Sequence, residues 1–440
     1  MKVLKFGGTS VGKPDRMHSV AKLISSTPDI KVVVLSAVSG TTNALVDISN
    51  KLTKKDTKAA EEAIANLFGP YKAFVEELYS TAEGKSKGHA IVKTYHDLIK
   101  SYVGAANFGD KETRLFLAQG EIISTNLFQE YLSEQGYSSA LLPALEFMKT
   151  DADNEPMLDY IETKLNEQLA KHPNKSLYIT QGYVCLNSDN EVDNLKRGGS
   201  DYTATLVGAA LQMDEIQIWT DIDGMHNNDP RIVSKTHPIH ELSFDEAAEL
   251  AYFGAKILHP TCILPAQKRN IPVLLKNTMQ PDALGTVISN INTSEGIKAV
   301  AAKDNICAIN IKSDRMLLAH GFLRAVFEIF ERYKTSIDMI TTSEIAVSLT
   351  IDNTLHLKEI KKELEEFANV EVEDEQTIIC IVGNLPREKA GYGFKILESL
   401  KDIPLRMVSY GGSSNNVSVL VNSKHKKEAL VALNKGLFGY

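Results

Sequence analysis

The sequence has few features that would link it to a membrane, a protein-bound metal or nucleic acid. Only four of its 440 residues are cysteine, and they lie far apart without the spacing of metal ligands (Cys185, Cys262, Cys307 and Cys380). No apolar run reaches 18 residues, and the N-terminus lacks the apolar core of a signal peptide, so we expect a cytoplasmic protein with buried thiols. The net charge of −8, without a dense Lys/Arg cluster, argues against nucleic acid and anionic membranes as partners.

Length and patterning indicate an α/β protein of more than one domain. At 440 residues the chain exceeds the usual size of a single hydrophobic core. In its first two thirds, short apolar runs such as 31–37 and 215–220 alternate with helical stretches such as 112–135, and polar loops follow the strands. This order predicts a mainly parallel sheet that binds ligands beyond the carboxyl ends of its strands. We expect residues 55–102 to form helices with a break at Gly84–Gly88.

The first residues of the chain carry the clearest functional signal. Lys2–Phe6 predicts a strand, Gly7–Gly12 a glycine turn, and Pro14 the start of a helix. This arrangement directs backbone N–H groups and a helix N-terminus at an anion. The glycines and Lys13 also match the start of a P-loop, but Pro14 stands where that motif needs a Ser or Thr for magnesium. A P-loop NTPase is therefore a disfavoured alternative.

The last third of the chain repeats a pattern of strand, helix, strand, strand and helix. Ile337 in the first repeat corresponds to Leu405 in the second. Such a repeat predicts two tandem ferredoxin-like βαββαβ modules. We place the α/β domain at residues 1–292 and the modules at 304–375 and 376–440. The sequence leaves open whether the last helix packs on the first module.

Four segments in series resemble one family. They are Lys5-Phe6-Gly7-Gly8-Thr9-Ser10, Arg197-Gly198-Gly199-Ser200-Asp201, Trp219-Thr220-Asp221-Ile222-Asp223-Gly224 and Phe253-Gly254-Ala255-Lys256. In this order they resemble the amino-acid kinase family and, within it, the aspartate kinases; the repeated modules resemble the ACT domains of the same enzymes. The resemblance runs nearly end to end. It implies transfer of the ATP γ-phosphoryl group to the β-carboxylate of L-aspartate, the first step of lysine, threonine and methionine biosynthesis. Mg²⁺ would arrive with ATP, without a metal site in the protein.

The resemblance also implies roles for single residues. Lys5 matches the catalytic lysine, which neutralises charge on the phosphoryl oxygens, and Asp201 matches an acidic residue that orients this lysine or the metal. The expected ATP-binding residues are Lys5, Phe6, Gly7, Gly8, Thr220, Asp221, His226, Arg231, Lys256 and Ile257. The expected aspartate-binding residues are Ser36, Thr42, Glu121, Arg197 and Ser200. Among these, Arg197 offers a planar fork for a carboxylate and Glu121 an acceptor for an ammonium.

Simpler explanations stand beside some of these roles. Asp201 also fits a helix cap, Glu121 a solvated helix-surface carboxylate, and Arg231 a surface turn after proline. The chain departs from the family at two positions. His226 stands where an aromatic residue, commonly tyrosine, is usual, and Asp223 where proline is more usual. A histidine can still stack on adenine or ribose, so His226 stays in the expected nucleotide site.

The first ACT module resembles most closely that of lysine-inhibited aspartate kinases. By that likeness an effector site comprises Met316, Gly321, Phe322, Leu323, Asp338, Ser343 and Glu344. In it, Asp338 or Glu344 would meet the ammonium of the effector. Because a threonine-sensing site differs by few residues, the sequence leaves lysine and threonine open as effectors. We expect a homodimer formed through the ACT modules, with a tetramer as the alternative.

Two other functions stay open at this stage. A kinase for another carboxylate, such as glutamate or acetylglutamate, would share the fold, although the paired ACT modules and the Arg197–Asp201 segment weigh against it. A catalytically silent amino-acid sensor is the alternative from a different class. The presence of Lys5, Asp201 and Lys256 together argues against this second alternative.

Overall fold

The computed structural model forms two compact units. Unit 1 comprises Met1–Gly224 and Leu258–Asn290, and unit 2 comprises Met225–Ile257 and Ile291–Tyr440. The structure describes residues 1–196, 198–254, 258–290, 294–313 and 321–440. Four expected site residues lie outside this described part, namely Arg197, Lys256, Ile257 and Met316. No helix within the described part is both long and apolar enough to cross a membrane.

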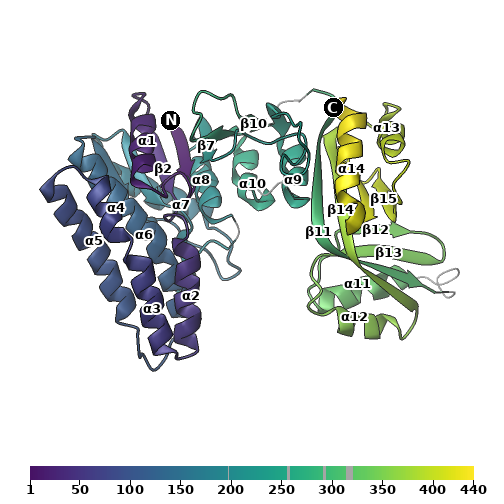
Figure 1. Ribbon diagram of the computed structural model, residues 1–440, viewed down its shortest axis with the longest axis horizontal. Coiled ribbons are helices and arrows are strands. Elements are labelled where there is room, and N and C mark those ends of the chain that lie inside the picture. Colours follow the sequence, from purple (N-terminus) through teal and green to yellow (C-terminus); the bar gives the residue numbers. More distant parts are fainter. Residues whose placement is uncertain (197, 255–257, 291–293, 314–320) are drawn as a thin grey trace. The chain divides into compact units, whose positions relative to one another are not determined.

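Unit 1 is built on a mainly parallel sheet, as expected (Figure 1). Its strands lie in the order β3 (Ser139–Leu142), β4 (Leu177–Gln181), β2 (Lys31–Leu35), β1 (Lys2–Phe6), β7 (Glu215–Thr220), β9 (Val273–Asn277) and β10 (Thr286–Ser289). Neighbours from β3 to β9 are parallel, and β10 is antiparallel to β9. The five residues of β2 are all buried, as its apolar run predicts for a strand covered on both faces.

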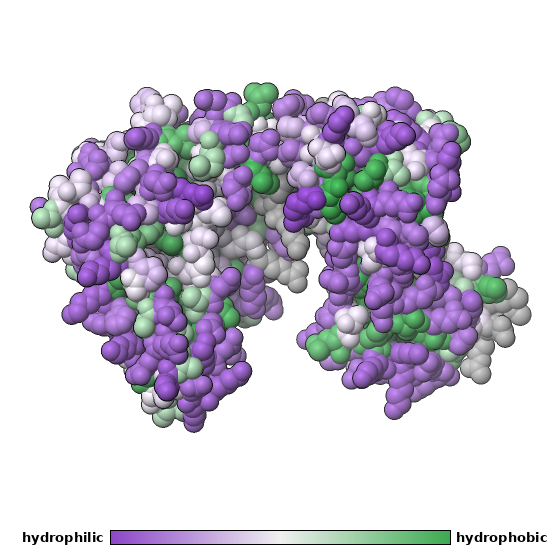
Figure 2. Space-filling view, viewed as in Figure 1, coloured by the Kyte–Doolittle hydropathy of each residue, from purple (hydrophilic) through white to green (hydrophobic). Residues whose placement is uncertain are grey.

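Helices connect these strands and supply most of the remaining core of unit 1. They are α1 (Pro14–Ser25), α2 (Thr41–Thr53), α3 (Thr57–Phe68), α4 (Tyr71–Leu78), α5 (Ala82–Lys100), α6 (Asp110–Glu134), η1 (Ala144–Glu146), α7 (Leu158–Ala170), α8 (Gly199–Ala210) and α10 (Pro260–Arg269). A short antiparallel pair, β5 (Val184–Leu186) and β6 (Val192–Asn194), stands apart from the main sheet. Figure 2 shows a mainly hydrophilic outer surface over the long helices, while their apolar faces join one core with β1 and β2.

Helix α5 corrects one expectation. It runs without interruption through Gly84–Gly88, so the break predicted there was wrong. A Cβ on Gly88 would collide with the ring of Tyr79 and lie 2.9 Å from Cγ1 of Val75. The glycine therefore serves close packing within the helix and does not end it. The helical structure is interrupted earlier instead, just before Thr81, whose hydroxyl caps the N-terminus of α5.

Unit 2 contains a second sheet, in which the long strands β11 (Gly296–Lys312) and β14 (Asn369–Asn384) pair side by side (Figure 1). The strand order is β12 (Met339–Thr342), β13 (Ala346–Ile351), β11, β14, β16 (Asn416–Asn422) and β15 (Met407–Tyr410). The helices are α9 (Phe244–Tyr252), which follows the short strand β8 (Glu241–Ser243), α11 (Phe322–Arg332), α12 (Leu357–Leu364), α13 (Tyr392–Ser399), the 3-10 helix η3 (Ser423–His425), α14 (Lys426–Leu433) and the π-helix η4 (Asn434–Phe438). The two ACT-like modules thus share one sheet.

Each module has its own apolar core. One core lies between α11, α12, β13 and the second half of β11. The other lies between α13, α14, β14 and β16, and it includes Val300 from the first half of β11. Because Val300 precedes the first module in sequence, the second core is assembled from two separate segments of the chain. Val233 joins this second core as well, which ties part of the 225–257 segment to unit 2.

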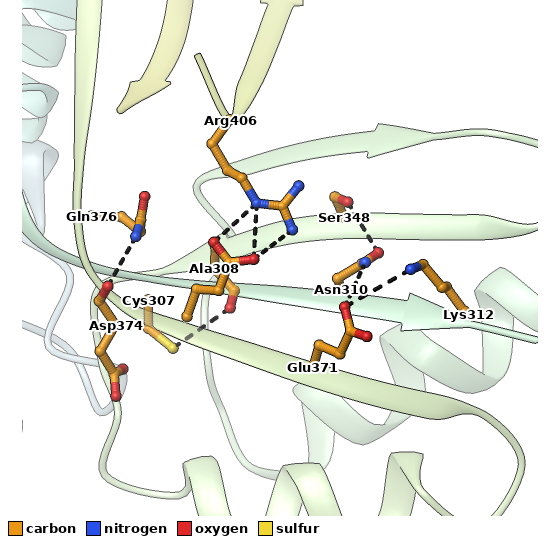
Figure 3. A network of polar contacts seen from close by, with 10 residues as sticks. Cys307, Ala308, Asn310, Lys312, Ser348, Glu371, Asp374, Gln376 and Arg406 are labelled. Atoms are coloured by element: carbon orange, nitrogen blue, oxygen red, sulfur yellow. Dashed lines mark hydrogen bonds and ion pairs between the residues drawn. The ribbon is translucent and has the colours of Figure 1, made fainter. Parts of the chain in front are cut away.

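A polar network crosses the middle of the unit 2 sheet (Figure 3). The side-chain amide of Asn310 accepts a hydrogen bond from Ser348 at 3.3 Å and donates to Glu371 at 3.4 Å. Nearby, Arg406 holds the carboxylate of Glu373 with donors at 2.7–3.0 Å. These contacts link β11 and β14, where the two strands pair, to β13 of one module and to Arg406, just before β15, of the other, so they help fix the register of the shared sheet.

Candidate active site

The centre of the candidate site is an ion pair between two expected catalytic residues. Lys5 lies near the carboxyl end of β1, and Asp201 lies in the first turn of α8. The Lys5 Nζ is 2.7 Å from Oδ1 of Asp201, and the side chains are only 12% and 15% exposed. The contact is an ion pair without the alignment of a hydrogen bond. Since an ammonium has three N–H donors, Lys5 keeps donors for a further anion.

The glycine turn after β1 comes close to the loop after β2. A Cβ on Gly8 would lie 2.9 Å from the carbonyl oxygen of Ala37, and one on Gly7 would lie 3.5 Å from Nζ of Lys5. Only glycine at position 8 therefore permits this approach without a shift. The Ser10 hydroxyl contacts Thr278 at 2.7 Å inside the protein, which assigns it a structural role.

The resemblance to a P-loop is accidental. Pro14 is the first residue of α1, and Lys13 precedes it in extended conformation without a capping side-chain bond. Proline suits this position because its missing N–H would have no partner in the first turn. The lysine beside an acidic partner is Lys5, before the glycines, as the sequence predicts.

A cavity of about 400 Å³ beside the turn brings several expected residues together. It is lined by Gly8, Thr9, Ser36, Ala37, Val38, Ser39, Gly40, Thr42, Asn43 and Glu121. Ser200 adjoins this set, because the Ser36 hydroxyl donates a hydrogen bond to its Oγ at 2.9 Å. The expected aspartate-binding residues Ser36, Thr42, Glu121 and Ser200 thus gather in one region of unit 1. Ser39 and Asn43 were not expected individually, although the polar composition of their loop was a signal.

Glu121 is the unusual ionisable group of this cavity. It is only 4% exposed, and its Oε2 has no hydrogen-bond partner among the described residues. Burial raises the pKa of Glu121 to about 7, against smaller opposing effects from backbone N–H groups and the charge of Lys5. The simpler interpretation of a solvated surface carboxylate is therefore wrong. A buried carboxylate oxygen without a hydrogen-bond partner among the described residues is suited to receive a positively charged ligand group.

The expected nucleotide residues are divided between the units. In unit 1, Thr220 ends β7 and its hydroxyl donates to Oδ1 of the adjacent Asp221 at 3.2 Å. The side chain of Phe6 is fully buried and stacks on Trp219 with 5.8 Å between ring centroids. Phe6 therefore offers a ligand only its main chain, whereas Asp221 is exposed at the carboxyl end of the sheet.

The other described nucleotide residues, His226 and Arg231, belong to unit 2. The ring of His226 contacts the Thr236 hydroxyl at 2.9 Å through Nδ1. Arg231 is 79% exposed and grips the Asp229 carboxylate with two donors at 2.8 and 2.9 Å. This contact raises the pKa of Arg231 and lowers that of Asp229. Arg231 thus has the surface-turn contact that the simpler interpretation predicts, and a phosphate would have to share its guanidinium with Asp229.

The described effector residues cluster by element in unit 2. Gly321 has φ of 93° and precedes α11, which begins with Phe322 and Leu323. Ser343 and Glu344 lie in the exposed turn between β12 and β13. The side chain of Asp338, just before β12, is fully buried in an ion pair with Lys303. This partner could not be predicted from the sequence, because Lys303 lies in β11, far from Asp338 along the chain.

Comparison with known proteins connects this geometry to a family. The model of the amino acid kinase family matches residues 1–277, and an ACT domain model matches residues 379–437. The chain is 34% identical to lysine-sensitive aspartokinase 3 of Escherichia coli over 448 residues, which cover 99% of each chain. It is 35% identical to the chloroplastic aspartokinase 3 of Arabidopsis thaliana, with 99% of this chain and 81% of the relative covered.

Solved structures give the same result. The E. coli aspartokinase III complex with aspartate and ADP, described as the R-state, matches with a TM-score of 0.85 and 33% identity over the whole of both chains. The complex of the same enzyme with lysine and aspartate, described as the T-state, matches with a TM-score of 0.80, covering 100% of this chain and 99% of the other. With a family model over most of its length and full-length relatives above 30% identity, this chain belongs to the aspartokinases of the amino acid kinase family.

Proposed function

We propose that the protein transfers the γ-phosphoryl group of ATP to the β-carboxylate of L-aspartate in the cytoplasm, giving 4-phospho-L-aspartate. The observation that carries this proposal is the Lys5–Asp201 ion pair beside a cavity lined by Gly8, Ser36 and Glu121. A carboxylate with a pKa near 4 is ionised at neutral pH, so the reaction needs no general base. It needs positioning and charge neutralisation, which a lysine and close backbone N–H groups can provide.

Each residue has a specific task in this proposal. Lys5 neutralises the transferring phosphoryl group, and Asp201 holds its ammonium in position. Glu121 receives the ammonium of aspartate, while Ser36, Thr42, Ser200 and Arg197 bind its carboxylates. ATP is bound by residues of both units, namely Gly7, Gly8, Thr220, Asp221, His226, Arg231, Lys256, Ile257 and the main chain of Phe6. Mg²⁺ would be carried by the phosphates of ATP and would neutralise part of their charge.

The proposal includes feedback inhibition by L-lysine at the first ACT module, with threonine as the alternative effector. The E. coli relative named lysine-sensitive aspartokinase 3 and the solved aspartokinase III complex with lysine and aspartate support lysine as the effector. The effector would contact Met316, Gly321, Phe322, Leu323, Asp338, Ser343 and Glu344, with its ammonium at Asp338. The functional particle would be a homodimer formed through the ACT modules, or a tetramer, which light scattering at several concentrations distinguishes.

A substrate panel tests the function. ADP release is measured with ATP, Mg²⁺ and either L-aspartate, L-glutamate or N-acetyl-L-glutamate, each with and without lysine or threonine. The proposal predicts turnover with aspartate but not with the other two carboxylates, and inhibition of this turnover by lysine. Because Glu121→Gln keeps the shape of the side chain but removes its charge, it should raise the Michaelis constant for aspartate far more than that for ATP. Preferred turnover of glutamate or acetylglutamate would overturn the substrate assignment.

A further inference from the structure

Four side chains of unit 2, those of Tyr252, Lys303, Asp338 and Asp352, form one polar cluster. The Tyr252 hydroxyl, at the end of α9, donates to Oδ1 of Asp338 at 2.7 Å. The Lys303 ammonium, from β11, contacts the same oxygen at 2.9 Å and Oδ2 of Asp352 at 2.9 Å. It also lies 4.2 Å from the centroid of the Tyr252 ring. Tyr252 therefore contacts both members of the Asp338–Lys303 pair.

The Asp338 carboxylate can accept one more donor. Its side chain is fully buried, and Oδ2 has no hydrogen-bond partner among the described residues. A buried carboxylate oxygen without a partner is costly, so the arrangement is completed by any ligand that brings an N–H donor to it. Lys303 and Tyr252 occupy only Oδ1. An effector ammonium that donated to Oδ2 would therefore leave both of these contacts in place.

Lys303 and Tyr252 differ in how they would respond to a second cation at Asp338. Burial would lower the pKa of Lys303, but its bonds to Asp352 and Asp338 outweigh this effect and raise it. Lys303 has Asp352 as a second carboxylate, whereas the Tyr252 hydroxyl bonds to Asp338. An ammonium at Oδ2 draws negative charge from Oδ1 and weakens the Tyr252 bond. Effector binding at Asp338 would therefore weaken a contact that holds the end of α9.

Other contacts hold helix α9 and the residues just after it against the unit 2 sheet. The fully buried Glu246 pairs with Lys298 of β11 at 2.9 Å, and Glu249 bonds to Asn416 of β16. Gly254 lies so close to the carbonyl of Ala302 that a Cβ would collide with it. Unlike these contacts, the hydrogen bond of Tyr252 is made to a residue of the proposed effector site, Asp338. In sequence, α9 leads directly to Lys256, a proposed ATP-binding residue.

We propose that Tyr252 couples effector binding to inhibition, through its hydrogen bond to Asp338. This inference rests on the proposed effector site and adds to it a residue outside that set. Tyr252 acts as a positioning residue: it works through Asp338, and its bond holds the end of α9 in place while no effector is bound. Loss of the hydroxyl should separate effector binding from inhibition.

The variant Tyr252→Phe tests the coupling, because it removes the hydroxyl and keeps the ring over Lys303. Lysine binding is measured by calorimetry and inhibition by the lysine concentration that halves activity, on the full chain. We expect uninhibited activity within about twofold of wild type and lysine binding equal or tighter, but inhibition weakened at least about fivefold. Tyr392→Phe is the matched control, since Tyr392 donates to Glu295 at 2.8 Å elsewhere in unit 2. It should behave as wild type.

Other outcomes are equally informative. An unchanged inhibition curve for Tyr252→Phe would overturn the coupling role, while lysine inhibition of the wild type would keep the proposed function intact. A wild type that phosphorylates aspartate but neither binds lysine nor is inhibited by it would overturn the effector site and the coupling together. The variant Asp338→Asn, which keeps the shape of the side chain, should weaken lysine binding at least about tenfold. If lysine bound this variant as tightly as the wild type, Oδ2 of Asp338 would not be the acceptor for the effector ammonium.

Discussion

The ammonium of Lys5 and the carboxylate of Asp201 lie 2.7 Å apart and join the central strand of unit 1 to the first turn of α8. Both side chains are largely shielded from water, so their attraction is stronger than that of a surface pair. Asp201 thereby limits the positions that the long Lys5 side chain can adopt. A lysine held in this way is prepared to meet a phosphoryl group without reorganising first.

Loss of the Lys5 charge should abolish turnover and leave the fold intact. Lys5→Met keeps the aliphatic stem, and we expect the turnover number to fall at least about a thousandfold, because the variant loses the ammonium that Asp201 holds in position. Lys2→Met is a matched control on the same strand, where Lys2 makes a loose surface contact with Glu215 at 3.6 Å. Its turnover should stay within about twofold of wild type. Steady-state kinetics and circular dichroism check both results, and a similar loss in both variants would refute the special role of Lys5.

The affinity for aspartate should depend on pH through Glu121. With a pKa of about 7 in the free protein, Glu121 is mostly neutral at pH 6 and mostly charged at pH 8. Only the charged form attracts an ammonium, so the Michaelis constant for aspartate should fall about tenfold between these values. Tyr71 and Tyr183, whose charges also act on this region, have pKa values of about 12 and do not titrate there. Glu121→Gln should show no such fall, and an equal pH dependence in that variant would assign the effect to another group.

The same group makes the folded protein less stable as pH rises. Folding raises the pKa of Glu121 from 4.5 to about 7, so the folded state binds more protons than the unfolded state between these values. The contribution of Glu121 to the free energy of unfolding is therefore complete below pH 4.5 and is lost as the pH rises through 7. The total loss is about 3 kcal/mol. Urea denaturation of wild type and Glu121→Gln measures this, and the difference in unfolding free energy between the two should change in favour of the variant as pH rises.

Helix α5 allows packing to be compared with helix propensity. Gly88→Ala would gain about 1 kcal/mol of propensity, but its methyl group would meet the Tyr79 ring and Val75. Since overpacking costs about 1–3 kcal/mol, we expect a net loss of unfolding free energy. Ser86→Ala, at an exposed position in the same helix, should be neutral or slightly stabilising. Chemical denaturation distinguishes them, and a stabilised Gly88→Ala would show that the helix can move to accept a methyl group.

The sequence predicted best where one local pattern decides the structure. The apolar runs of β2 and β7 predicted strands correctly, and Pro14 predicted the start of α1, because strand burial, which is complete in β2, and helix initiation leave a local signature. The break expected at Gly84–Gly88 was wrong because glycine is read as a helix breaker when its packing partner, Tyr79, is unknown. Local composition does not contain this tertiary contact.

The candidate site was predictable in part for the same reason. Lys5, Gly8, Ser36 and Glu121 lie in segments that follow strands or carry family motifs, and the structure brings them to one region of unit 1. The environment of Asp338 was not predictable, because Tyr252 ends α9, Lys303 lies in β11 and Asp352 follows β13, and these elements are far apart in sequence. The roles of all these side chains remain predictions for the experiments above.

Trapping of the product with hydroxylamine tests the central claim most directly. An acyl phosphate reacts with hydroxylamine to form a hydroxamate, whose position on aspartate is identified by mass spectrometry against synthetic standards. We predict that the wild type forms the β-hydroxamate of L-aspartate in a reaction that needs ATP and Mg²⁺, and that Lys5→Met forms almost none. Release of ADP without any β-hydroxamate, or equal product from the wild type and Lys5→Met, would contradict the account.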